Sequence, residues 1–208
     1  MGPLAGRQNR CAILLVSLWL SGCAAVTAAA VVPGALLEAV VDQFVGEEES
    51  FAASIETALA ATQLSLRSMK LDVDVLEIQH EGGYAIAFGN SNLDGSITLK
   101  KQTARLTTIY VKARSTIREE SVERAIIEAT GAKMKAMPHG EHFQKFGYHN
   151  LRQKPTTESA IVGWFRPGAR MEVYDSGASP WLKIKLPSGK MAYLKGSTKN
   201  TVVQHAER

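Results

Sequence analysis

Residues 181–190 read WLKIKLPSGK, and this stretch decides the fold of the C-terminal part of the chain. Leu182, Ile184 and Leu186 alternate with Lys183 and Lys185, so an extended backbone places these three apolar side chains on one face and both lysines on the other. The Pro-Ser-Gly sequence at 187–189 is typical of a tight turn between two strands. The stretch therefore predicts a strand with one buried face and one solvent face, followed by a hairpin.

Three neighbouring segments share this strand character and resemble the bacterial SH3 domain. They are NLRQKP at 150–155, GWFRPGARMEV at 163–173 and MAYL at 191–194. Strands this short bury their apolar faces by closing into a small barrel, which also hides their edges. The resemblance implies an all-β SH3-like barrel over 148–200, followed by a tail over 201–208.

The predicted barrel supplies the candidates for a ligand-binding surface. They share aromatic or basic side chains and are Trp164, Tyr174, Trp181, Lys183, Lys185 and Tyr193. A small barrel needs large apolar side chains in its core, so we expect the two tryptophans to be at least half buried. The two tyrosines, with the lysines beside them, are then the candidates for the surface.

The region before the barrel begins and ends with a helical pattern. From Ser54 onwards, apolar residues recur every three or four positions, which predicts a helix over 54–70. Ser50 or Ser54 can cap its first turn. A second apolar stripe starts at Ser121, and Gly131 is placed to end that helix.

Four segments between these helices are rich in β-branched and aromatic residues: 73–79, 84–89, 96–101 and 106–113. In the first segment, Val73 and Val75 alternate with Asp72 and Asp74, which predicts that the two valines share a face. Short polar turns join the segments and favour an antiparallel meander, with a further strand expected around 40–45. Helices on one face of such a sheet make a small two-layer domain over 41–134, and the fold class is α+β.

This region, roughly residues 40–134, also resembles a small α+β domain of unknown function that occurs in proteobacterial lipoproteins. The resemblance rests on the helix over 54–69, the strand segments 95–99 and 106–111, and the start of the second helix at 121–127. It implies no reaction.

The chain begins like a secreted protein. Arg7 and Arg10 precede an apolar run over 11–20, and small residues then lead to Cys23. A basic segment, an apolar run and small residues at a cleavage point are the features of a secretory signal. The run is too short to span a bilayer.

The sequence Leu20-Ser21-Gly22-Cys23 resembles the lipobox of bacterial lipoproteins. The resemblance implies cleavage of a signal peptide, residues 1–22, between Gly22 and Cys23, acyl chains on Cys23, and a tether over 23–40. Ala24 is not the Asp that retains lipoproteins in the inner membrane of Gram-negative bacteria, which implies the periplasmic face of the outer membrane. Two alternatives are a plain signal peptide with Cys23 incidental and an uncleaved helix over 11–41, which would contain Pro33-Gly34.

Composition restricts the other classes of function. The chain has 24 Lys and Arg against 20 Asp and Glu, and Arg7 and Arg10 lie in the predicted signal, so the mature charge is close to balance. Nucleic-acid binding is therefore not expected. Cys11 and Cys23 are the only cysteines, so no disulfide is expected in the mature protein. Acidic residues concentrate before Leu99 and basic residues after it.

Catalytic and metal motifs are weak. Residues 135–147 contain Pro138 and Gly140 and are predicted to be a linker, in which His139, Glu141 and His142 offer two imidazoles and one carboxylate without an evident further ligand. The sequence has no Gly-x-Ser-x-Gly elbow and no phosphate-binding loop. We expect no catalytic residues, no metal and no cofactor.

These observations predict a non-enzymatic envelope lipoprotein, held to the membrane by lipid, whose SH3-like domain binds a cell-wall stem peptide or an envelope protein. A structural or assembly subunit without cell-wall contact is the alternative. A metal-dependent wall hydrolase using His139 and His142 is a third, minor hypothesis.

Overall fold

A computed structural model of the chain describes residues 46–138, 140–196 and 202–204. All of them belong to one compact unit, residues 39–208. The predictions for the signal peptide 1–22, the cleavage between Gly22 and Cys23, the tether 23–40 and a strand around 40–45 lie outside the described residues, as does His139.

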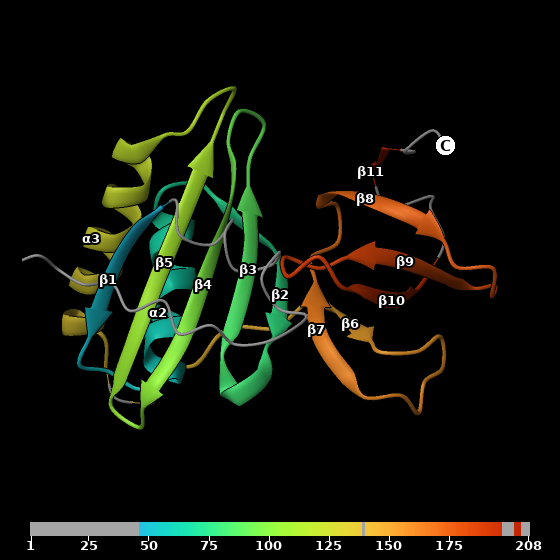
Figure 1. The fold of residues 1–208 in the computed structure, drawn as a ribbon, viewed down its shortest axis with the longest axis horizontal. Helices are drawn as coiled ribbons and strands as arrows, with labels where there is room; N and C mark the ends of the chain where they lie inside the picture. The colour runs from blue at the N-terminus through green and yellow to red at the C-terminus, as the bar shows by residue number, and fades with distance from the viewer. Residues whose placement is uncertain (1–45, 139, 197–201, 205–208) are drawn as a thin grey trace, which may run out of the picture. The chain divides into compact units, whose positions relative to one another are not determined.

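The first module of this unit has two layers and is α+β (Figure 1). Its elements are β1 (Glu47–Phe51), α2 (Ile55–Ser68), β2 (Asp72–Ile78), the 3-10 turn η1 (His80–Gly82), β3 (Tyr84–Gly89), β4 (Asp94–Thr103), β5 (Leu106–Arg114) and α3 (Glu120–Ala136). The strands pair antiparallel in the order β1-β5-β4-β3-β2, and both helices lie on one face of this sheet. The predicted meander and its two helices are confirmed.

The first helix, α2, begins where the sequence predicts. The Ser54 side chain accepts a hydrogen bond from the backbone N–H of Thr57 at 3.2 Å, so Ser54 is the N-cap. The apolar stripe of α2, which includes Ile55, Leu59 and Leu66, is buried against the sheet.

Gly131 does not end the second helix, contrary to the prediction. It lies inside α3, which continues to Ala136. A Cβ atom at this position would come within 2.9 Å of the Phe51 ring on β1. The glycine is therefore explained by close packing between α3 and β1, not by termination of the helix.

Strand β2 contributes to two hydrophobic cores. The prediction that Val73 and Val75 share a face is wrong, because a β-bulge interrupts the pairing with β3 between them. Val73 and Leu76 belong to the helix-side core of the first module, whereas Val75 is fully buried in the core of the second module.

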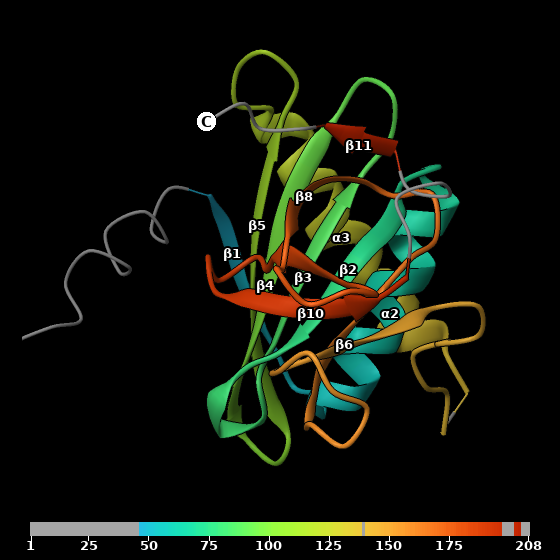
Figure 2. The same cartoon turned by 90° about the vertical axis from the view of Figure 1, so that its right-hand side faces the viewer.

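The second module continues the same sheet. Its strands are β6 (His149–Arg152), β7 (Ile161–Phe165), β8 (Arg170–Asp175), β9 (Trp181–Lys185), β10 (Met191–Lys195) and β11 (Val202–Gln204). β7 pairs antiparallel with β2, and the order continues β7-β6-β10-β9-β8-β11 (Figure 1). β11 is parallel to β8 (Figure 2). The two modules are thus joined by strand pairing.

The segment predicted as a linker, 135–147, packs against the first module. Phe143 is buried in the helix-side core. The Gln63 side chain of α2 donates to the backbone oxygen of Gln144 at 3.0 Å and accepts from its backbone N–H at 2.7 Å. The Tyr148 hydroxyl then donates to the backbone oxygen of Val73 at 2.9 Å.

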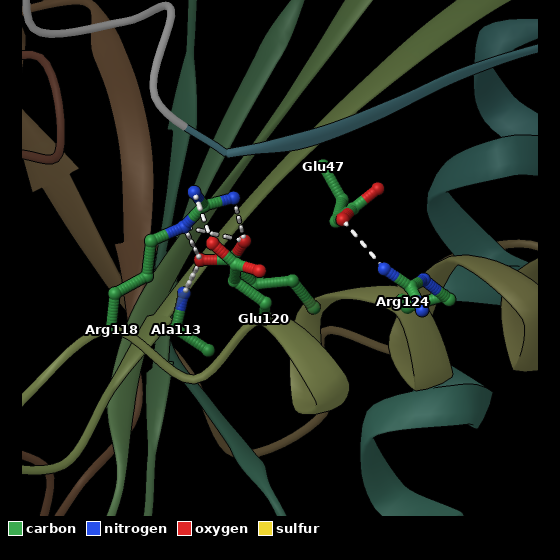
Figure 3. A network of polar contacts seen from close by, with 6 residues as sticks. Glu47, Ala113, Arg118, Glu120 and Arg124 are labelled. Atoms are coloured by element: carbon green, nitrogen blue, oxygen red, sulfur yellow. Dashed lines mark hydrogen bonds and ion pairs between the residues drawn. The ribbon is translucent and has the colours of Figure 1, made fainter.

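A buried carboxylate fixes the start of α3 to the sheet. The Glu123 side chain is only 1 % exposed, accepts from the Arg118 guanidinium at 2.6 Å, and accepts from the backbone N–H of Ala113 on β5 at 2.9 Å. Figure 3 shows the Arg118 guanidinium beside Glu120, the backbone nitrogen of Ala113 joined to a carboxylate oxygen, and a separate pair between Arg124 and Glu47. Burial raises the pKa of Glu123, but its hydrogen bonds from Arg118 and Ala113 outweigh this effect and keep the pKa below its usual value.

Replacing Glu123 by alanine should lower the free energy of unfolding by about 3 kcal/mol, because it leaves the Ala113 N–H and the Arg118 guanidinium without their partner. Urea unfolding of the chain from residue 24 measures this change. Glu120 is the matched control, since it pairs with the same arginine but is 62 % exposed. Glu120→Ala should change stability by no more than about 0.5 kcal/mol, and equal losses in the two variants would contradict this assignment.

Candidate functional site

Cross-strand pairing brings three of the predicted site residues together. Tyr174 on β8 lies opposite Lys183 on β9, and Lys183 lies opposite Tyr193 on β10. Tyr193 in turn lies opposite Arg152 on β6. Directly opposed residues project from the same face of a sheet, so these four side chains form one line across four strands, which we call the outer row.

The outer row lies on the solvent face of the second module. The neighbouring positions along the same strands, Val173, Ile184, Ala192 and Leu194, are buried in its core together with Val75 of β2. All four residues of the outer row are partly exposed. The alternation predicted for the strand at 181–186 is therefore confirmed.

The outer row has both basic and acidic neighbours. Lys185 on β9 and Lys195 on β10 are exposed and lie two residues from Lys183 and Tyr193, whereas the exposed acids Glu172 and Asp175 lie two residues and one residue from Tyr174 on β8. The Tyr174 hydroxyl donates to the Glu172 carboxylate at 2.5 Å, and this hydrogen bond raises the pKa of Tyr174. Arg152 donates from one Nη atom to the backbone oxygen of Ser159 at 2.5 Å.

These groups suit recognition of an anion. Ammonium and guanidinium groups donate strong hydrogen bonds to carboxylates, and the tyrosine rings offer flat apolar area beside them. The row therefore provides cations at two positions, Lys183 and Arg152, separated by the ring of Tyr193.

The two tryptophans are not part of this surface, although both are at least half buried as expected. Trp164 lies opposite Leu76 of β2 and packs against the helix-side core, with the Lys145 ammonium 4.4 Å from its ring centroid. Trp181, at the start of β9, is only 9 % exposed. Both residues therefore serve packing in the structure.

An ion pair holds the second module in place beside β2. Arg166, which follows β7, donates to the Asp74 carboxylate at 2.6 Å and lies 3.4 Å from that of Asp72. Its backbone N–H also donates to the backbone oxygen of Asp74 at 2.8 Å. Burial raises the pKa of Asp74, and the contacts with Arg166 oppose that effect. The outer row thus has a fixed position relative to the first module.

The predicted histidine cluster receives no support from the described side chains. His142 is exposed, and His139 lies outside the described residues. No group of three His, Cys, Asp or Glu side chains suitable for a metal occurs among residues 46–138, 140–196 and 202–204. Within the same part of the chain, neither helix has the length and apolar character needed to cross a bilayer.

Arg152 is the member of the outer row that the sequence analysis missed. The alternation along 181–186 identifies the outward residues of one strand, whereas Arg152 becomes their neighbour only because β6 pairs with β10. Periodicity within a strand carries no information on that pairing.

Comparison with known families identifies the second module. Residues 147–198 match the family described as the bacterial SH3 domain. A comparison with curated proteins finds no match to the chain. The second module is therefore a bacterial SH3 domain, a class that suggests binding to the cell wall or to proteins. The resemblance of the first module to a lipoprotein domain stays a prediction.

Proposed function

We propose that this protein is an envelope lipoprotein whose SH3 domain binds stem peptides of the cell wall through the outer row. The observation that supports the proposal most directly is the row itself, in which Tyr174, Lys183, Tyr193 and Arg152 share the solvent face of a domain of this class. Stem peptides carry carboxylates, and the two cations of the row, Lys183 and Arg152, complement that charge.

In this proposal the protein acts by binding, not by catalysis, and is held at the periplasmic face of the outer membrane by acyl chains on Cys23. The lipobox-like sequence before Cys23 supports the anchor. Two or three acyl chains attach a protein durably to a bilayer without a membrane-spanning helix.

Exchanging Tyr193 and Lys183 for alanine together should reduce retention on purified cell-wall sacculi at least about fivefold, which corresponds to about 1 kcal/mol. The two changes remove a ring and a cation from the centre of the outer row. The chain from residue 24 is mixed with sacculi, and the bound fraction is measured after sedimentation.

The double variant Tyr110→Ala with Lys112→Ala is the matched control, because it removes the same residue types from β5 of the first module. Its retention should equal that of the unchanged chain. If the unchanged chain itself binds no better than an unrelated protein, the cell-wall version is wrong, and an assembly role through an envelope protein becomes the better hypothesis.

A further inference from the structure

A pocket of about 240 Å³ lies where the two modules meet. One wall is the turn between β2 and β3 together with β4, and the other is the hairpin between β9 and β10. Four side chains of its lining carry a basic group: His80, Lys100, Lys101 and Lys190. The first three come from the first module, and Lys190 comes from the SH3 domain.

Glu77 of β2 fixes the hairpin over this pocket. Its side chain is buried, and its two carboxylate oxygens accept hydrogen bonds from the backbone N–H of Ser188 at 2.9 Å and from the Ser188 hydroxyl at 2.6 Å. Lys190, two residues further on, has its Nζ 3.4 Å from Nε2 of His80. Because an ammonium only donates, Nε2 of His80 acts as the acceptor in this contact.

The lysines of the pocket form no ion pairs within the described part of the chain. Lys100, Lys101 and Lys190 are exposed, and none of them forms an ion pair with a residue in the described part of the chain. Of the two acids in the lining, Glu77 is engaged by Ser188 and Glu81 is exposed to solvent. Three ammonium groups that lack an ion-pair partner in the described part of the chain suit an anionic group from outside the protein.

Lys185 on β9 lies between the outer row and the hairpin that lines the pocket. Lys185 follows Lys183 on the same face of the strand, about 7 Å away. Lys185 lies opposite Met191, which directly follows Lys190 in the chain. Basic side chains therefore succeed one another from the outer row to the pocket.

From this arrangement we infer that the pocket is a second carboxylate subsite for the same acidic peptide that the outer row binds. The first module thereby contributes Lys100 and Lys101 to the binding site. The inference rests on the proposed function.

The double variant Lys100→Gln with Lys190→Gln tests the subsite in the chain from residue 24. Retention on purified sacculi should fall about tenfold, because both sides of the pocket lose a cation. Both lysines are exposed, so urea unfolding should be unchanged. Lys133→Gln with Lys154→Gln, which removes two exposed lysines elsewhere, is the control and should retain full binding.

Two outcomes would overturn the inference, and only the second of them also contradicts the proposed function. If the pocket variant binds as well as the unchanged chain while the Tyr193 and Lys183 variant loses binding, the subsite is wrong and the proposed function stands. If the unchanged chain shows no retention on sacculi, both fall together.

Discussion

Replacing Gly163 by alanine should lower the free energy of unfolding of both modules together, by about 3 kcal/mol. Gly163 lies on β7 opposite Glu77 of β2, and a Cβ atom there would come within 2.3 Å of the backbone oxygen of Leu76. The obstructing atom belongs to the main chain of the neighbouring strand, so the clash forces β2 and β7 apart. Separation also withdraws Val75 from the core of the SH3 domain.

Urea unfolding followed by two probes measures this effect. In the chain from residue 24, tryptophan fluorescence reports on Trp181 in the SH3 domain and on Trp164 where β7 meets β2. Far-ultraviolet circular dichroism reports mainly on α2 and α3 in the first module. In a cooperative unit the two transitions coincide and shift together to lower urea.

Gly196→Ala is the control for this substitution, because nothing lies within 4 Å of a Cβ atom at that position. It should alter stability by less than about 0.5 kcal/mol. Two separate transitions in the unchanged chain, or equal stability of the two variants, would show that the strand junction does not couple the modules.

Local patterns were sufficient to predict most elements of the fold. The strand predicted at 84–89 is found as Tyr84–Gly89, and the helix predicted at 54–70 is found as Ile55–Ser68 with Ser54 as its cap. These features depend on residues within a few positions of one another, where alternation and capping act.

The incorrect predictions share a non-local cause. The bulge between Val73 and Val75 allows β2 to serve two cores, one of which is built from residues about a hundred positions later. Gly131 packs against Phe51 across the first module. Neither contact can be inferred from the sequence beside these residues. The local patterns therefore predicted that Val73 and Val75 share a face and that Gly131 ends a helix, and both predictions were wrong.

The candidate site shows the same difference between what local patterns predict and what pairing of distant strands decides. Lys183 was predicted from alternation within its strand, and Tyr174 and Tyr193 were predicted as the aromatic residues left for the surface once the tryptophans fill the core. The structure brings these three residues together in the outer row. Trp164 was included because it is aromatic, but the pairing of β7 with β2 turns it towards the helix-side core. Pairing across the junction decided which residues share a surface.

Under the proposed function, changing Cys23 to serine should prevent attachment of acyl chains and remove the protein from the membrane fraction. A serine side chain lacks the thiol that is acylated in lipoproteins, and cleavage before residue 23 should then fail. Each buried methylene contributes about 0.8 kcal/mol to membrane binding, so loss of the acyl chains is the largest single change in the energy of attachment. Intact mass of the purified protein, together with membrane fractionation of cells, measures both effects.

The chain supplies its own control for this experiment in Cys11, the other cysteine. Cys11 lies in the segment predicted to be removed, so Cys11→Ser should give the same mature mass and the same membrane fraction as the unchanged protein. A Cys23→Ser variant that is cleaved and fractionates like the unchanged protein would exclude lipid attachment at Cys23. Binding by the outer row would then need another explanation for how the SH3 domain is brought to the cell wall, since the anchor is what places it there in the proposed function.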